Sequence, residues 1–305
     1  MTEPPTSRAA ADFQDLVLPL LFDSAAPAAE PVLVMITGQP GAGTAAAARS
    51  AELMWPQQQF VTINGNELAA LRPEWATAQT DPFTARATVS AGVREWIDQA
   101  VEHGRERRVA MMVDGGGQDP ATLVGYAQRC AASGYLVHLV AMAVPSPVSR
   151  LREAGRFYVE RALGGPGRWV STGEHDIAYP QTPMAVAAAQ VTAQVQRITV
   201  LNQVGEVVAD NERDGAAGPW KSPPTAAKAM VELRWQRPTP EAANAWLTSH
   251  RQVLAIANTA GHNRATRETF TRLGTEATWT FESMSNPDRG VPPVLPMNPR
   301  FEPSQ

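Results

Sequence analysis

The residues best suited to chemistry form a glycine-rich segment, Gly38-Gln-Pro-Gly-Ala-Gly43, near the start of the chain. An apolar run at residues 31–37 precedes it, and an alanine-rich stretch at residues 44–54 follows it. The spacing G-x-x-x-x-G between a strand and a helix is typical of loops whose backbone N–H groups bind nucleotide phosphates. The start of the following helix adds the positive end of its dipole. The segment therefore predicts an anion- or nucleotide-binding loop. A turn that keeps its glycines only for close packing is the alternative.

The two positions after the loop lack the side chains that phosphate transfer normally uses there. A working loop continues with Lys, which reaches the terminal phosphates, and then with Ser or Thr, which holds Mg²⁺. This chain has Thr44 and Ala45 instead, and the nearest cation, Arg49, is expected to point away from the loop. The predicted contacts to a nucleotide therefore come from the segment itself, namely from Gly38, Gly41, Ala42, Gly43, Thr44 and Ala45.

Apolar strands alternate with amphipathic helices around this loop. We expect strands at residues 31–37, 60–64, 108–113 and 135–143, and helices at residues 44–54, 84–103 and 119–133. Asp119 and Pro120 have the residue types of a helix N-cap and first position. The pattern predicts an α/β fold of the P-loop NTPase type, with a parallel sheet flanked by helices and a helical C-terminal region.

Four segments are expected along the chain. Residues 1–28 are predicted to be an N-terminal extension with a short helix, and residues 29–211 a P-loop domain that ends in a hairpin at residues 197–211. Residues 212–285 are predicted to be a helical C-terminal region. The proline-rich residues 286–305 are expected to be a disordered tail.

Composition excludes several classes of function. The 305-residue chain has a formal charge of −4 and a pI of about 5.8, which argues against a general nucleic-acid binder. The single cysteine, Cys130, excludes an internal disulfide. No apolar stretch approaches the roughly 20 residues that span a bilayer, and the first residues do not resemble a secretory signal. We therefore expect a cytoplasmic protein that binds neither membrane nor nucleic acid.

Several polar residues outside the loop have two interpretations each. Asp114 ends an apolar strand, where P-loop proteins place a carboxylate linked to Mg²⁺, but it could equally cap a loop. Arg168 is suited to phosphate or to a solvated surface. His175 and Asp176 favour the start of a helix over acid–base work, and Asn66 is expected to be a helix N-cap.

Taken together, four segments resemble the zeta toxin family of P-loop kinases over residues 31–211. They are the glycine loop, the run Ile63-Asn64-Gly65-Asn66-Glu67-Leu68 with Arg72-Pro73-Glu74-Trp75, the turn Val113-Asp114-Gly115-Gly116, and residues 150–179 with Gly167-Arg168-Trp169-Val170 and His175-Asp176-Ile177-Ala178-Tyr179. The resemblance implies a transferase that phosphorylates the 3′-hydroxyl of UDP-N-acetylglucosamine with ATP or GTP and Mg²⁺. It also implies an antitoxin or another protein as partner.

The resemblance assigns roles to individual residues. Asn66 stands where the family has its catalytic Asp, and an amide cannot accept a proton as a carboxylate does. Asp114 and Gly116 match substrate-contacting positions, although Gly116 lacks the hydroxyl that the family has there. Two arginines that embrace the triphosphate match Arg168 and Arg161, with Arg156 as the alternative to Arg161. The metal ligands stay unassigned.

Two functions therefore remain open. The first is ATP-dependent phosphorylation of a nucleotide sugar, with arginines stabilising the charge and Asp114 holding the metal. The second is a catalytically inactive module that binds a nucleotide, a nucleotide sugar or a protein. Loss of the lysine, the metal-binding hydroxyl and the base favours the second on chemical grounds.

Overall fold

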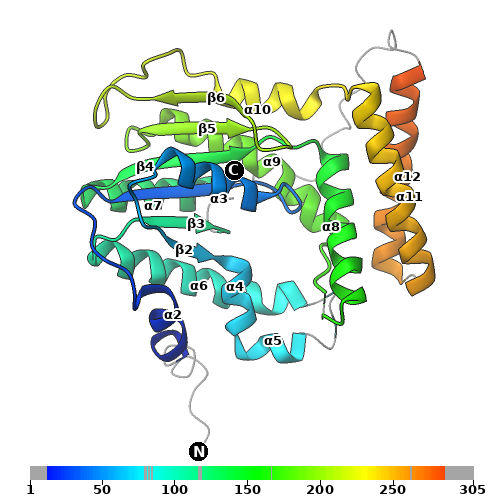
Figure 1. Cartoon of the computed structure of the whole chain (residues 1–305), viewed down its shortest axis with the longest axis horizontal. Helices are drawn as coiled ribbons and strands as arrows, with labels where there is room; N and C mark the ends of the chain where they lie inside the picture. The colour runs from blue at the N-terminus through cyan, green and yellow to red at the C-terminus, as the bar shows by residue number, and fades with distance from the viewer. Residues whose placement is uncertain are drawn as a thin grey trace, which may run out of the picture.

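A six-stranded sheet forms the centre of the molecule, with the strand order β2-β3-β1-β4-β5-β6 (Figure 1). The computed structural model describes residues 12–78, 81, 83, 85–115, 119–165, 167–261 and 263–285. Neighbouring strands are parallel except β5 and β6, which form an antiparallel hairpin. The sheet confirms the predicted α/β fold. Its strands are β1 (Val32–Thr37), β2 (Val61–Asn64), β3 (Met111–Asp114), β4 (Leu136–Met142), β5 (Arg197–Leu201) and β6 (Val207–Glu212).

Helices cover both faces of this sheet because β1 is apolar on both sides. Leu33 and Met35 join the larger core, to which residues of α6, α7 and α9 contribute. Val32, Val34 and Ile36 point the other way and pack with residues of α3. The helices up to this point in the chain are η1 (Phe13–Val17), α2 (Leu18–Phe22), α3 (Thr44–Met54), α4 (Gly65–Leu71), α5 (Pro73–Ala78), α6 (Ala85–Glu106), α7 (Pro120–Ala132), α8 (Ser146–Ala162) and α9 (Thr172–Val191).

Polar caps determine where two of these helices begin. At α7, Asp119 accepts a hydrogen bond from the backbone N–H of Thr122 at 2.9 Å, and Pro120 occupies the first turn, as predicted. At α9, Ser171 and Glu174 form a reciprocal capping box. The expectation that His175 and Asp176 start this helix was therefore wrong.

The N-cap of α4 also differs from the prediction. Asn64, the last residue of β2, accepts a hydrogen bond from the backbone N–H of Asn66 at 2.8 Å. Asn66 therefore lies inside the first turn, and its side chain remains available for other contacts. The helix begins two residues earlier than expected because the cap is supplied by the end of the strand itself.

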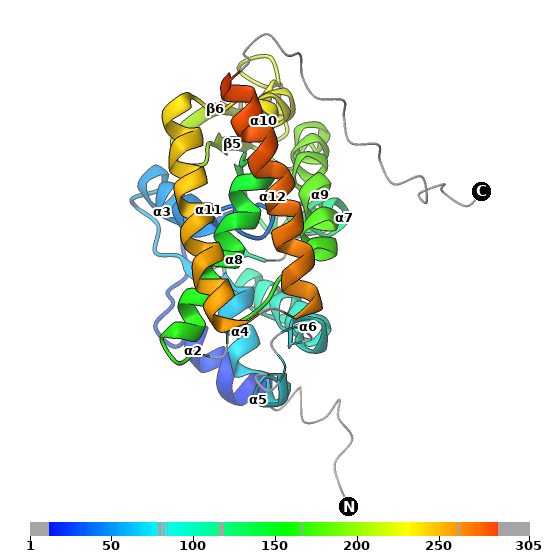
Figure 2. The ribbon, with the colours of Figure 1, turned by 90° about the vertical axis from the view of Figure 1, so that its right-hand side faces the viewer.

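Three C-terminal helices follow the hairpin: α10 (Ala226–Trp235), α11 (Pro240–Ala260) and α12 (Arg264–Ser285). Figure 2 shows α11 and α12 side by side over α8. Helices α8, α11 and α12 contribute to one apolar cluster that includes Phe157, Trp246 and Leu273. Residues 286–305, predicted to be a tail, lie outside the described residues. Within the described ranges, no helix has the length and apolar character needed to cross a membrane.

Candidate functional site

The glycine loop connects β1 to α3 at the carboxyl edge of the parallel strands. Its turn is closed by a hydrogen bond from the N–H of Ala42 to the carbonyl of Gln39 at 3.0 Å. Gly43 is the N-cap of α3, with φ of 86°, and no side-chain hydrogen bond caps this helix. The first amides of α3 therefore lie at a helix start that carries positive partial charge, which is a suitable place for an anion.

Helix α8 packs directly along this loop. A Cβ atom on Gly41 would lie 2.0 Å from the carbonyl oxygen of Ser149 and 3.0 Å from Cγ of Glu153. Gly41 also has φ of 79°, which favours glycine. Glycine is thus required here by both the backbone conformation and the close approach of α8.

Arg152 brings a guanidinium group to the loop. Its Nη1 lies 3.8 Å from the position that a Cβ on Gly43 would occupy, and its Nη2 donates a hydrogen bond to the carbonyl of Gln203 at 3.1 Å. Arg152 is exposed as a whole, but partial desolvation of its guanidinium group lowers its pKa, and the group stays charged at neutral pH. Reasoning from the sequence missed Arg152. Its position one helical turn before Arg156 was a signal that could have pointed to it.

Asp114 lies beside the loop because β3 pairs with β1 in a register that places Asp114 opposite Ile36. The hydroxyl of Thr44 donates a hydrogen bond to Oδ2 of Asp114 at 2.8 Å. Burial raises the pKa of this carboxyl group, and the nearby Glu67 raises it further, while the bond from Thr44 opposes the change. The structure therefore brings together two predicted site residues, Thr44 and Asp114.

Asn66 and Arg168 form a second pair, although 102 residues separate them in the chain. The Nη1 of Arg168 donates a hydrogen bond to Oδ1 of Asn66 at 2.5 Å. The two pairs are neighbours, since Gly65 and Gly115 are so close that a Cβ on Gly115 would lie 3.3 Å from Cα of Gly65. The start of α4 thus meets the turn after β3.

The other candidate arginines have different surroundings. Arg156 donates hydrogen bonds to Glu153 at 2.7 Å, to Glu160 at 2.6 Å and to the carbonyl of Arg168 at 3.1 Å. Arg161 is exposed on the last turn of α8, and a Cβ on Gly167 would lie 2.9 Å from its side chain. Arg156 therefore positions the Arg168 backbone. Gly116, predicted to contact the substrate, lies outside the described residues.

His175 belongs to a buried polar network rather than to a helix cap. Its Nε2 lies 2.9 Å from the hydroxyl of Ser149, which also accepts a hydrogen bond from the side chain of Gln39 at 3.1 Å. Burial lowers the pKa of His175, so the ring is neutral at pH 7. The fully buried Ser149 is not accessible as a nucleophile. This network instead connects the glycine loop with α8 and α9.

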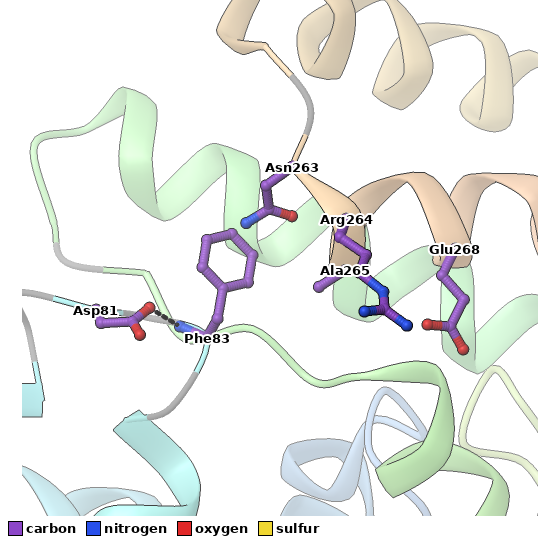
Figure 3. A pocket seen from close by; sticks show the side chains of 6 residues that line it. All are labelled: Asp81, Phe83, Asn263, Arg264, Ala265 and Glu268. Carbon is purple, nitrogen blue, oxygen red and sulfur yellow. Dashed lines mark hydrogen bonds between the residues drawn. The ribbon is translucent and has the colours of Figure 1, made fainter.

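Two hollows among the described residues lie away from the loop. The larger, of about 540 Å³, is bordered by Asp81 and Phe83 on one side and by residues at the start of α12 on the other (Figure 3). Phe83 packs against Phe157 and Trp169, so this hollow adjoins the apolar cluster that α8 forms with α11 and α12. The smaller, of about 250 Å³, lies between the N-terminal helices and β2. Of the residues that the structure describes, no three His, Cys, Asp or Glu side chains gather in a way that could hold a metal ion.

Comparisons with known proteins agree with the fold. The model of a family described as Zeta toxin matches residues 20–214. Among solved structures, the chain is similar to one from the PezAT chromosomal toxin–antitoxin system of Streptococcus pneumoniae, at 16% identity and a TM-score of 0.68, covering 84% of this chain and 99% of that one. It is also similar to a structure of AvrRxo1-ORF1:-ORF2 with ATP, at 11% identity and a TM-score of 0.51, covering 89% and 86%. No curated protein is close enough in sequence to match.

Proposed function

Since the chain belongs to the zeta toxin family, we propose that it binds ATP at the glycine loop but transfers phosphate poorly. The single observation that carries the proposal is the uncapped start of α3, with the Arg152 guanidinium beside Gly43. Backbone amides and a nearby arginine together favour a polyphosphate even where the loop lysine is missing. ATP is the nucleotide to test first because the similar AvrRxo1-ORF1:-ORF2 structure is a complex with ATP.

Two features of the site oppose rapid phosphoryl transfer. Thr44 replaces the loop lysine, and its hydroxyl already donates to Asp114. Asn66 replaces the base that the family resemblance implies, and its amide oxygen accepts from Arg168. Loss of one well-placed charged donor typically reduces a rate by about 10² to 10³, so the combined losses support a nucleotide-binding role with little turnover.

Asp114 is the group best suited to a magnesium ion that accompanies the nucleotide. Mg²⁺ takes oxygen ligands and is usually held by one or two carboxylates together with substrate phosphates, a set that Asp114 and a bound triphosphate would supply. Burial raises the pKa of Asp114, and a divalent cation nearby would favour its ionised form. Mg²⁺ is therefore proposed to strengthen ATP binding.

Phosphorylation of UDP-N-acetylglucosamine is the second candidate function. Its support is the hydrogen bond between Arg168 and Asn66, which joins a residue matched to the triphosphate-binding arginines with the residue matched to the catalytic base. An antitoxin is the corresponding candidate partner, because the PezAT relative is described as part of a toxin–antitoxin system. This function requires turnover, whereas the preferred one requires only binding.

Calorimetric titration with ATP, with and without Mg²⁺, tests the preferred function. We expect saturable binding by the wild type, strengthened by Mg²⁺, and at least about tenfold weaker binding by Arg152→Met because a charge-assisted contact is lost. Arg49→Met is the matched control, since it removes the same charge from a residue that is also exposed but lies in the second turn of α3. No saturable binding by the wild type, or equal loss in both variants, would contradict the proposal.

A further inference from the structure

Arg234 extends from α10 into the interior beside the glycine loop. The residue is 5% exposed, and its guanidinium stacks on Tyr179, with 3.4 Å between Cζ and the ring centroid. The Nη2 atom donates a hydrogen bond to the carbonyl of Tyr179 at 2.5 Å and a longer one to Oε1 of Gln39 at 3.5 Å. A residue of the C-terminal helices thus contacts the loop that follows β1.

Gln39 connects this arginine to the loop backbone. It is the second residue of the glycine segment, and the residue is 1% exposed. Its Nε2 donates hydrogen bonds to the carbonyl of Val144 at 2.8 Å and to Ser149 at 3.1 Å, while its own carbonyl accepts the N–H of Ala42 that closes the turn. Any group that holds the Gln39 side chain therefore also restricts the loop.

The charge of Arg234 lacks an acidic partner within the described part of the chain, unlike that of other buried arginines. Arg72 pairs with Glu74 at 2.8 Å, and Arg150 pairs with Asp176 at 2.6 Å. Among the described residues, the hydrogen bonds of Arg234 go only to a carbonyl and to an amide oxygen. Burial lowers its pKa, which is the expected effect where no carboxylate balances the charge. A buried cation without a counter-charge is unfavourable, and an anion bound nearby would relieve that cost.

We propose that Arg234 is a positioning residue that gives the loop the positive potential missing at position 44 and makes polyphosphate binding depend on α10. This inference rests on the proposed binding of ATP. Arg234 acts through Gln39, which holds the turn, and through its charge, which favours the negative charge of the bound phosphates. The loss of affinity caused by removing the charge of Arg234 should grow with the number of phosphates on the ligand. A loss of affinity caused only by disturbed folding should not depend on that number.

Titrations of ATP, ADP, AMP and inorganic tripolyphosphate into the wild type and Arg234→Met test this inference. We expect Arg234→Met to weaken ATP and tripolyphosphate at least about tenfold, ADP less, and AMP least. Lys228→Met is the matched control, because it removes the same charge from an exposed residue of the same helix, and it should change each affinity less than about twofold. Equal weakening of all ligands by Arg234→Met would overturn the inference.

The remaining outcomes separate this inference from the function on which it rests. A wild type that binds neither ATP nor tripolyphosphate overturns both. If the wild type and Arg234→Met bind ATP with equal affinity, the role of Arg234 is overturned and the binding of ATP is not. If circular dichroism shows that Arg234→Met does not fold, Arg234→Lys and Gln39→Met decide the question. Both should weaken ATP severalfold, and wild-type affinity in both would overturn the inference.

Discussion

Replacing Gly41 by alanine tests whether α8 closes on the glycine loop. Gly41 has φ of 79°, a left-handed conformation that costs an alanine roughly 1–2 kcal/mol. The new Cβ would lie 2.0 Å from the carbonyl oxygen of Ser149, far inside the ordinary contact distance. Because that oxygen belongs to the backbone of α8, the loop and the helix would have to separate. Such overpacking typically adds about 1–3 kcal/mol.

Gly43→Ala separates the two contributions. Gly43 has φ of 86°, but the atom nearest to the place that its new methyl group would take is Arg152 Nη1 at 3.8 Å, an ordinary contact. Gly43→Ala should therefore cost only the conformational part, whereas Gly41→Ala should cost about 2 kcal/mol more. Urea unfolding followed by circular dichroism measures both free energies. Equal destabilisation of the two variants would refute the close packing of α8 on the loop.

Two further predictions concern a buried histidine and the replaced catalytic positions. Burial and the nearby Arg197 lower the pKa of His138 from 6.5 to about 3, so its neutral ring contributes stability fully above pH 6.5, and this is lost as the pH falls toward 3. When the pH is lowered from 7.5 to 5, the free energy of unfolding of His138→Gln should therefore fall by about 2 kcal/mol less than that of the wild type, as measured by urea unfolding. Equal decreases in the two proteins would contradict the lowered pKa of His138. The triple variant Thr44→Lys, Ala45→Thr and Asn66→Asp should phosphorylate UDP-N-acetylglucosamine at least about 10²-fold faster than the wild type, as followed by ³¹P NMR. A folded but inert triple variant would exclude this sugar nucleotide as substrate.

Local patterns predicted the elements that carry the site. The helix at residues 44–54 has the predicted bounds because a glycine turn precedes it and apolar alanines continue it. Asp119 and Pro120 predicted the start of α7 because capping depends on a few adjacent residues. At Asn66 the same local reasoning was wrong, since Asn64 has an equally suitable side chain and the end of β2 decides between them.

The arrangement of arginines could not be predicted in this way. Arg152 approaches Gly43 only because α8 packs on the loop, and that packing depends on a glycine at position 41. Arg234 reaches Gln39 from a helix 195 residues away in the chain. Sequence spacing along α8 also left Arg156 and Arg161 as alternatives. The contact between Arg156 and the carbonyl of Arg168 is a tertiary feature that spacing does not specify.

The replaced residues of the site have opposite effects on its charge. Under the proposed match to the family pattern, Thr44 stands in place of a lysine and Asn66 in place of an aspartate, so the two differences together would leave the net charge of the site the same. The field that attracts a polyphosphate depends mainly on the total charge nearby, whereas catalysis depends on charges placed at particular atoms. Asn66 also accepts a hydrogen bond from Arg168, a contact that an amide oxygen makes without carrying a charge of its own. Binding is therefore expected to tolerate this pair of substitutions far better than phosphoryl transfer does.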